Sequence, residues 1–370
     1  MTKKMELLAA CHGKHLDKVP YGPRIDLWYN YHNAHGTLPE RYQGWSMIDI
    51  LRDLGVGGQK RHYSVVKEEI HGIEVEETHD PPYTRTTYTT PYGTVTSTLL
   101  FNPFEGAWIG YESEKLFKSD KDYDAIRCVI EHITPVPDPA YEHACEEVGE
   151  DGLVMSGIRG WSAPQRVMRE IMGYEMFFYE LMDHPKQVEE LIEVMKELDR
   201  KKLQLVLDTD IELVNVCGNW SDDIHTPVFR KYFIPWFKEV NAVLHAHDKL
   251  SMAHIDGENR RLLPLLRETD IDVWEAWTPY PMTKDTTAQL REAVGPQGVI
   301  WGGIPSILFD DPTTDEEFDD FIVNTLFKEA APGYNFIIGM GDNLPFDGKL
   351  ERVQRVAQLI EEHGTLPIDG

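Results

Sequence analysis

The sequence predicts an α/β fold, a (β/α)8 TIM barrel, from three observations. Short apolar segments alternate with amphipathic helices from about residue 150 onward, which is typical of parallel βαβ units. Two further strands in the first 70 residues bring the predicted strands to eight. The chain of 370 residues is long enough for one such barrel with insertions. A doubly wound open sheet is the alternative.

The predicted strands of the repeat are short and apolar, and polar residues follow them. They are 153–158, 211–216, 250–255, 271–275, 298–301 and 334–338. Helical patterns lie between and after them, at 185–207, 227–247, 314–330 and 350–363. We therefore expect one barrel domain that covers 1–370.

The N-terminal part of the chain lacks this alternation of strands and helices and contains a β-rich stretch. Helical patterns at 4–17 and 45–54 are followed by a stretch rich in Thr and Tyr at 83–90, and by a stretch of Thr and apolar residues at 94–101. Thr, Val and Tyr favour strands, and the intervening Pro-Tyr-Gly favours a turn, so the two stretches predict a β-hairpin. We interpret it as part of a β-rich insertion at about 60–115.

Composition and charge exclude several classes of function. The formal net charge of −27 would be repelled by nucleic-acid phosphates and by an anionic membrane surface. No apolar run approaches the ~18 residues needed to span a bilayer, and the first residues lack the apolar region of a signal peptide. The four cysteines are widely spaced without a CxxC motif, which fits a reduced cytoplasm. We expect a cytoplasmic protein that binds neither nucleic acid nor a membrane.

Polar side chains gather at the C-terminal ends of the predicted strands, where α/β barrels carry their active sites. They are His254, Asp256, Glu275, Asp342 and Asn343. An imidazole with carboxylates can bind Zn²⁺ through three ligands and leave one position open for substrate. His254 and Asp256 are two residues apart, so they lie on the same face of an extended segment and can share one ion. Taken singly, each of these residues is equally consistent with a loop anchor or a helix cap.

Other residues at the same strand ends predict a substrate pocket. Four tryptophans fall at or after strand ends, which indicates an aromatic-lined pocket for a flat ligand: Trp28, Trp161, Trp220 and Trp277. Arg24 could bind a substrate carboxylate or form a structural salt bridge. Asn219 and Asp222 follow the strand at 211–216, and Asp222 could instead stabilise the start of the next helix.

The order of several short motifs resembles the uroporphyrinogen decarboxylase superfamily. The matching segments are Val19-Pro20, Gly173-Tyr174-Glu175, 182–185, Asp222 with 232–236, His254-Ile255-Asp256-Gly257 and 339–345. The likeness covers roughly residues 1–363 and implies a (β/α)8 barrel.

Two differences distinguish the branches of this family. Its decarboxylases carry an Arg-Gln-Ala-Gly-Arg type of segment for propionate groups, where this chain has the single Arg24. Its cobalamin-dependent methyltransferases bind zinc through His-x-Cys and a later Cys, where this chain has His254-x-Asp256 and then Asp342 or Asn343. The chain is most similar to the methyltransferase components of corrinoid O-demethylase systems, which use oxygen and nitrogen ligands.

The resemblance implies that a methyl group moves from a methoxylated aromatic compound to the cob(I)amide of a separate corrinoid protein. This chain has no DxHxxG cobalamin motif, so the corrinoid, and methylcobalamin as the product, are expected on that partner. The expected catalytic residues are His254, Glu275 and Asp256, and the expected zinc ligands are these three with Asp342. The expected substrate-binding residues are Asn219, Trp220, Trp277, Asn343, Arg24, Trp28 and Asp222. Without a metal, the same acidic set would surround the ether oxygen with hydrogen bonds.

Three other functions remain open from the sequence. One is a cofactor-free decarboxylase of the same fold that uses Arg24 and Asp26. Another is a methyltransferase for methanol or a methylamine. The third is a non-catalytic barrel that docks on a corrinoid protein. The sequence does not determine the oligomeric state and is compatible with a homodimer.

Overall fold

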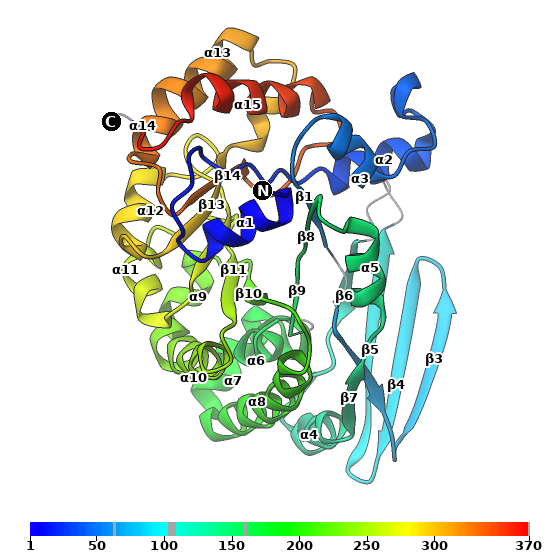
Figure 1. Ribbon diagram of the computed structural model, residues 1–370. Coiled ribbons are helices and arrows are strands. Elements are labelled where there is room, and N and C mark those ends of the chain that lie inside the picture. The colour runs from blue at the N-terminus through cyan, green and yellow to red at the C-terminus, as the bar shows by residue number, and fades with distance from the viewer. Residues whose placement is uncertain (62–63, 103–108, 159–160, 369–370) are drawn as a thin grey trace. The chain divides into compact units, whose positions relative to one another are not determined.

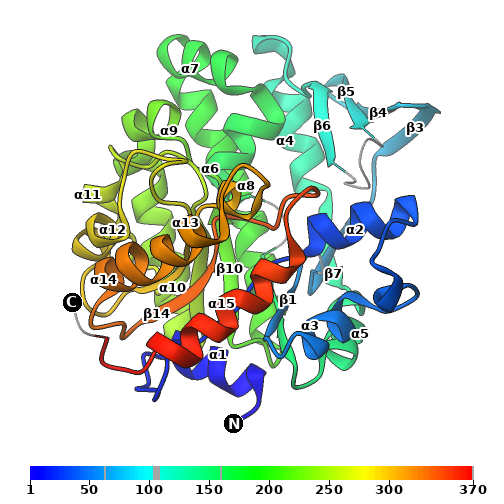
Figure 2. The ribbon, with the colours of Figure 1, turned by 90° about the horizontal axis from the view of Figure 1, so that it is seen from above.

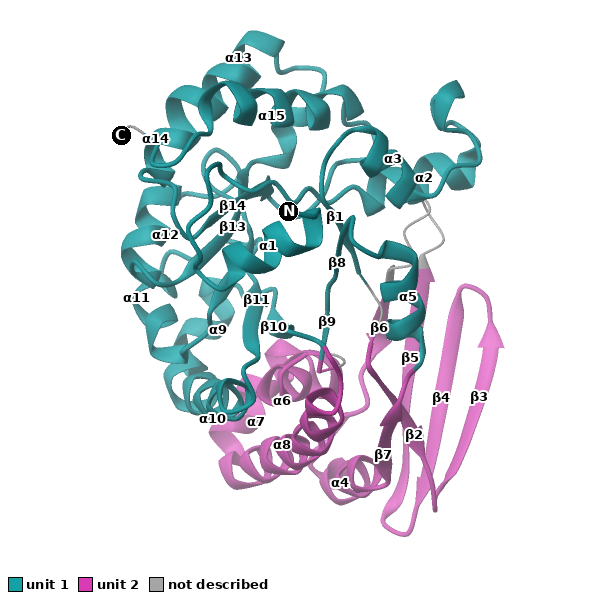
Figure 3. Cartoon of the chain, viewed as in Figure 1, with its two compact units in different colours: residues 1–63, 139–157, 211–370 teal, residues 64–138, 158–210 magenta. Residues whose placement is uncertain are grey.

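The computed structural model describes residues 1–61, 64–102, 109–158 and 161–368 (Figure 1). They form two compact units, which Figure 3 colours separately. Unit 1 comprises 1–63, 139–157 and 211–370, and unit 2 comprises 64–138 and 158–210. The β-rich segment predicted at about 60–115 lies mostly in unit 2, together with helices from further along the chain.

Unit 1 contains a parallel sheet in the order β14-β13-β12-β11-β10-β9. Its strands are β9 (Ser156–Gly157), β10 (Leu213–Gly218), β11 (Leu250–His254), β12 (Val273–Trp277), β13 (Val299–Ile304) and β14 (Phe336–Met340). A second parallel pair joins β1 (Gly58–Lys60) to β8 (Gly152–Val154), which directly precedes β9. Each of the six apolar segments predicted as a strand overlaps one of these strands, so the predicted strands are confirmed, although most of the observed strands end two or three residues later.

One further segment, at 20–22, runs beside β14. Tyr21 and Ile338 form a parallel bridge, and the amide of Gly22 donates to the carbonyl of Ile338 at 3.0 Å. Within the described residues, no backbone ladder joins this segment to β1. The side chain of Gln59 spans the gap instead, since its Nε2 donates to the carbonyl oxygen of Gly22 at 2.8 Å. The strand segments thus follow one another as in the predicted (β/α)8 barrel, with one seam bridged by a side chain.

Helices of unit 1 lie outside the parallel strands (Figures 1 and 2). They are α1 (Lys3–Cys11), α2 (Asp26–His35), α3 (Met47–Asp53), α5 (Ala140–Val148), α9 (Asp222–Val228), α10 (Ile234–His245), α11 (Leu263–Leu266), α12 (Thr287–Val294), α13 (Asp315–Asp320), α14 (Phe327–Ala330) and α15 (Leu350–His363). The prediction for α15 agrees residue for residue. The helices predicted at 227–247 and 314–330 are interrupted by π-helical turns at Phe229–Phe233 and Phe321–Leu326.

Helix α1 closes the N-terminal end of the strands. Its buried residues Leu7, Ala10 and Cys11 pack in one apolar cluster with strand residues of the barrel. The other members are Met155, between β8 and β9, and the strand residues Leu153, Leu213, Met252, Val273, Val299, Trp301 and Ile337. Burial of these side chains removes apolar surface from water and fills this end of the sheet. The polar residues that follow the strands are therefore gathered at the opposite end.

Unit 2 contains an antiparallel sheet in the order β3-β4-β5-β6. Its strands are β3 (Glu74–Asp80), β4 (Tyr83–Thr90), β5 (Gly93–Asn102) and β6 (Ile109–Glu114). The predicted hairpin is confirmed, since β4 pairs with β5 and Thr90 lies opposite Gly93. A separate pair joins β2 (Val66–Ile70) and β7 (Ile133–Pro137). The helices of this unit are α4 (Tyr123–Glu131), α6 (Ala163–Arg166), α7 (Tyr174–Asp183) and α8 (Pro185–Leu207).

A buried ionic cluster joins strand β2 to helices α6 and α8 within unit 2. Glu68 Oε1 lies 2.9 Å from Arg166 Nη1 and 2.5 Å from Lys202 Nζ. Lys202 is fully buried and is also 3.4 Å from Asp199 Oδ1. Burial alone would raise the pKa of Glu68, but Arg166 and Lys202 outweigh it and lower the pKa to about 2.

The helices in the described part of the chain include none with both the length and the apolar character of a membrane-spanning segment.

Candidate active site

The register of the barrel places an imidazole beside a carboxylate. His254 is the last residue of β11, and Glu275 lies directly opposite it on the adjacent strand β12. The two side chains point the same way, and His254 Nδ1 is 2.7 Å from Glu275 Oε2. A carboxylate only accepts, so Nδ1 carries the proton in this contact. Glu275 is 2% exposed, which makes this a buried, charge-assisted hydrogen bond.

The other ring nitrogen of His254 faces two further carboxylates. Nε2 lies 3.6 Å from Asp256 Oδ2 and 3.4 Å from Asp342 Oδ1. One ligand atom from each of these three residues lies within 4.8 Å of the others. Asp256 follows β11 and Asp342 follows β14, so the C-terminal ends of two strands contribute to one cluster, as the sequence predicted.

An arginine near the N-terminus holds Asp342 in this cluster. Arg24 Nη1 bonds to Asp342 Oδ1, and its Nε lies 2.7 Å from Asp26 Oδ1. Asp342 has a φ of 72°, a left-handed conformation that is uncommon for a residue other than glycine. Nearby, the backbone N–H of Leu27 donates to Asn343 Oδ1 at 3.2 Å. Arg24 and the first residues of α2 therefore fix the loop that presents Asp342.

Arg61 is a site residue that the sequence analysis did not identify. Its Nη2 bonds to Glu275 Oε1, the carboxylate oxygen that does not face His254. Arg61 directly follows β1, so it has the same position after a strand as the other site residues. Strand β1 has only three residues, and Gly57 and Gly58 stand at its start, so the sequence shows no clear strand pattern there.

Charges around His254 shift several pKa values. Burial alone would lower the pKa of His254, but Glu275, Asp256 and Asp342 outweigh it and raise that pKa well above its usual value. Burial would raise the pKa of Asp342, yet His254 and Arg24 lower it to about 2. The pKa of Glu275 is likewise lowered against burial, by Arg61 and His254. Both carboxylates are therefore ionised at neutral pH.

The donor set fits a divalent cation such as zinc. His254 Nε2, Asp256 and Asp342 supply one nitrogen and two oxygen ligands, the three-ligand pattern of an open zinc site. Glu275, in contact with Nδ1, matches the carboxylate that commonly orients a metal-bound histidine.

The net charge of the side chains around His254 also fits a divalent cation. Among the described residues around His254, the carboxylates are Asp26, Asp256, Glu275 and Asp342, and the guanidinium groups are Arg24 and Arg61. One divalent ion would balance the two excess negative charges.

Glu275 was expected as a metal ligand, and the structure places it elsewhere around the ring. Its oxygens contact His254 Nδ1 and Arg61, on the side of the imidazole opposite to Nε2. From this position, Glu275 can orient the imidazole but is poorly placed to bind the same ion as Nε2.

Other residues expected in a substrate pocket lie in the packing of the helices. Trp220 is 1% exposed, and its ring contacts Phe229, Phe237 and Trp274. Trp277 is fully buried, and its Nε1 donates to Thr287 Oγ1 of α12 at 3.3 Å. Both indoles thus point toward the outer helices, and we do not propose that they stack on a substrate ring.

The other two tryptophans expected at the pocket lie elsewhere. Trp28 is buried in α2, with its ring 4.6 Å from that of His32. Trp161 is partly exposed, and its ring lies under the guanidinium of Arg169.

Asn219 and Asp222 both form hydrogen bonds with residues at the end of β11 or after it. The amide of Asn219 donates to the carbonyl of His254 at 2.7 Å, and Asn219 has a left-handed φ of 53°. The amide of Asp222 donates to the carbonyl of Glu258, and its Oδ2 accepts from the amide of Arg261 at 3.2 Å. Asp222 therefore connects the loops after β10 and β11, in addition to its position in the first turn of α9.

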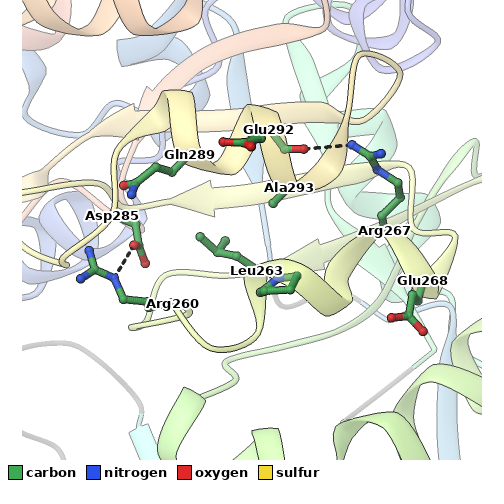
Figure 4. A pocket seen from close by; sticks show the side chains of 9 residues that line it. Arg260, Leu263, Arg267, Glu268, Asp285, Gln289, Glu292 and Ala293 are labelled. Carbon is green, nitrogen blue, oxygen red and sulfur yellow. Dashed lines mark hydrogen bonds and ion pairs between the residues drawn. The ribbon is translucent and has the colours of Figure 1, made fainter.

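A surface pocket of about 950 Å³ lies between α11 and α12 (Figure 4). Leu263 and Ala293 contribute apolar surface to it, and Arg260 pairs there with Asp285. Its lining includes none of the residues around His254. It is a groove between outer helices and is separate from the candidate site.

Comparisons with known proteins agree with this fold. The model of the family described as uroporphyrinogen decarboxylase (URO-D) matches residues 140–363. The fold is similar to that of a methyltransferase from Methanosarcina mazei, with a TM-score of 0.63 and 14% identity over 98% of this chain and 99% of that chain. A dipeptide epimerase from Methylococcus capsulatus complexed with a Mg ion aligns over 80% of this chain and 79% of its own, at 12% identity. Its TM-score of 0.21 is too low to indicate a common fold. No curated protein sequence matches the chain.

Proposed function

Because the chain belongs to the uroporphyrinogen decarboxylase family, we propose that it is a methyltransferase of this fold that demethylates methoxylated aromatic compounds. The acceptor would be the cob(I)amide of a separate corrinoid protein. The observation that carries the proposal is the cluster of His254 Nε2, Asp256 and Asp342 at the C-terminal ends of β11 and β14. The M. mazei methyltransferase of similar fold supports the reaction class.

The chemical difficulty of the reaction lies in the leaving group. The methyl carbon leaves the ether oxygen without its bonding electrons, and the oxygen keeps both of them as a phenolate. The conjugate acid of a phenolate has a pKa near ~10, so this group must be stabilised as its charge develops. A zinc ion held by His254, Asp256 and Asp342 would supply Lewis acidity at the ether oxygen.

The protein's own residues prepare this site in three ways. Glu275 keeps the proton of His254 on Nδ1 and turns Nε2 toward the two aspartates. Arg24 neutralises part of the charge of Asp342 and fixes its loop. In the metal-free protein, the raised pKa of His254 keeps a proton available on Nε2. That proton could stabilise a departing oxyanion directly, so the metal-free alternative uses the same residues.

The position of Arg24 argues against the decarboxylase alternative. A decarboxylase would need Arg24 to bind a substrate carboxylate, but Arg24 already contacts Asp26 and Asp342. The excess of carboxylates around His254 would also repel a substrate with several carboxylates. An uncharged methyl ether meets neither obstacle.

The test is a methyl-transfer assay with the purified chain and chemically reduced cobalamin in place of the corrinoid protein. 2-Methoxyphenol, methanol and methylamine are offered separately, and both the methylcobalamin absorbance and the released phenol are measured. Transfer from the aromatic ether alone, lost in His254→Ala with unchanged circular dichroism, is the expected result. Transfer from methanol or a methylamine would replace the substrate class. Absence of transfer, with release of CO₂ from a pyrrole carboxylate, would overturn the proposal.

A further inference from the structure

A continuous series of side-chain hydrogen bonds crosses the open seam of the barrel. It begins at the carbonyl of Gly22, which accepts from Trp301 Nε1 at 3.0 Å and from Gln59 Nε2 at 2.8 Å. Gln59 Oε1 in turn accepts from Arg61, from Nε at 3.1 Å and from Nη2 at 2.7 Å. Arg61 Nη2 also bonds to Glu275, which accepts from His254.

Each amide and carboxylate atom in this series has a defined role. The amide nitrogen of Gln59 donates to a backbone carbonyl, so its oxygen must face Arg61. The two oxygens of Glu275 are divided between Arg61 and His254. Gln59 and Glu275 are both 2% exposed, so water cannot readily replace a missing partner.

We propose that Gln59 and Arg61 are positioning residues, which lock Glu275 and thereby hold the His254 imidazole with Nε2 toward Asp256 and Asp342. The physical reason is the freedom of the glutamate side chain. Without Arg61, one oxygen of a buried carboxylate would have no cation, and the Glu275 side chain would turn to find another partner. The imidazole would then lose the contact that fixes its orientation. The series also links the seam between the 20–22 segment and β1 to the active site.

The importance of these residues for methyl transfer rests on the proposed function, but their effect on His254 does not. A suitable readout is the Nδ1–H proton of His254, which a buried carboxylate should protect from exchange. Protein labelled with ¹⁵N-histidine is examined by ¹H–¹⁵N NMR at one fixed pH, and the resonance is assigned by its loss in His254→Gln. A second readout is the affinity of the metal-free protein for Co²⁺, followed by visible absorbance.

The variants separate orientation from general destabilisation. Arg61→Met removes the guanidinium, whereas Arg61→Lys keeps the charge without its planar fork of donors. Gln59→Glu keeps the acceptor for Arg61 but cannot donate to Gly22. Arg355→Met is the matched control, because Arg355 pairs with Asp319 on outer helices. Circular dichroism verifies the fold of each variant.

We expect Arg61→Met to lose the protected Nδ1–H resonance and to bind Co²⁺ about 10- to 100-fold more weakly. Arg61→Lys and Gln59→Glu should show smaller losses, and Arg355→Met should match the unmodified protein. If Arg61→Met does not fold, the two milder variants carry the test. Retention of the resonance and of Co²⁺ affinity within twofold in the folded Arg61 and Gln59 variants would overturn the inference. Loss of the resonance in a protein that transfers no methyl group would uphold the inference and reject only the proposed function.

Discussion

His254 and Glu275 occupy matched positions on adjacent parallel strands, and their side chains meet at 2.7 Å between Nδ1 and Oε2. Since paired residues on parallel strands project to the same side, this contact follows from the register of β11 and β12. It leaves Nε2 as the nitrogen that faces Asp256 and Asp342. The register of the sheet thus decides which ring nitrogen is available for chemistry.

Replacement of His254 should abolish metal binding and methyl transfer while the fold persists. His254→Gln removes the nitrogen ligand. The phenolate leaving group would then be stabilised less, and the rate of methyl transfer should fall by about 10²–10³-fold or more. Elemental analysis and the methylcobalamin assay measure the two effects. His245→Gln is the control, because His245 contacts Asp272 at the end of α10. Normal zinc content in His254→Gln would refute the ligand assignment.

Removal of bound metal should lower thermal stability. A ligand that binds only the folded state stabilises it by about 2.7 kcal/mol at 100 times its Kd. Calorimetry of chelator-treated protein, before and after addition of zinc, should therefore show a rise in Tm on addition. The rise should be absent in the double variant Asp256→Asn with Asp342→Asn. An equal rise in that variant would place the metal elsewhere in the protein.

Neutralising Glu275 should destabilise the protein by more than the loss of one hydrogen bond would. Glu275→Gln leaves the guanidinium of Arg61 buried without a counter-charge, and breaking a buried ion pair in this way typically costs about 3–5 kcal/mol. Urea denaturation measures the free energy of unfolding. Glu351→Gln, at an exposed position on α15, is the control and should be nearly neutral. A loss below about 1 kcal/mol in Glu275→Gln would show that the pair contributes little.

The ionic cluster of unit 2 should make stability depend on pH through Glu68. Its pKa is lowered from 4.5 to about 2 in the folded protein, so its contribution is fully present above pH 4.5 and is lost as the pH falls toward 2. The shift corresponds to a contribution on the order of 3 kcal/mol. Asp199, whose pKa is raised chiefly by burial, acts in the opposite direction. Comparison with Glu68→Gln isolates the effect of Glu68.

The measurement is urea denaturation of both proteins at pH 7 and pH 3.5. Glu68→Gln should be much less stable than the unmodified protein at pH 7, and the difference should narrow at pH 3.5. Glu190→Gln, at an exposed position on α8, should show no such narrowing. A constant difference between the two pH values would mean that Glu68 has the same pKa in the folded and the unfolded protein.

Much of the fold was predictable because its signals are local. The apolar strands, the helices α8 and α15, and the hairpin of β4 and β5 each depend on periodicity and turn residues within a short stretch. The predicted helices at 227–247 and 314–330 were too regular, because π-helical turns form where tertiary packing overrides the local pattern. The roles of Trp220 and Trp277 were also beyond the sequence, since position after a strand does not say which way an indole points.

The strand pattern was enough to predict that His254, Asp256 and Asp342 would meet at one end of the strands. Parallel strands share a direction, so the residues that follow them must share an edge. Three features could be seen only in the folded chain: Glu275 lies behind the imidazole, Arg24 is already paired, and Gln59 and Arg61 cross the seam. Those contacts join residues that are far apart in the chain, and they depend on strand register and on side-chain packing that no short stretch of sequence encodes.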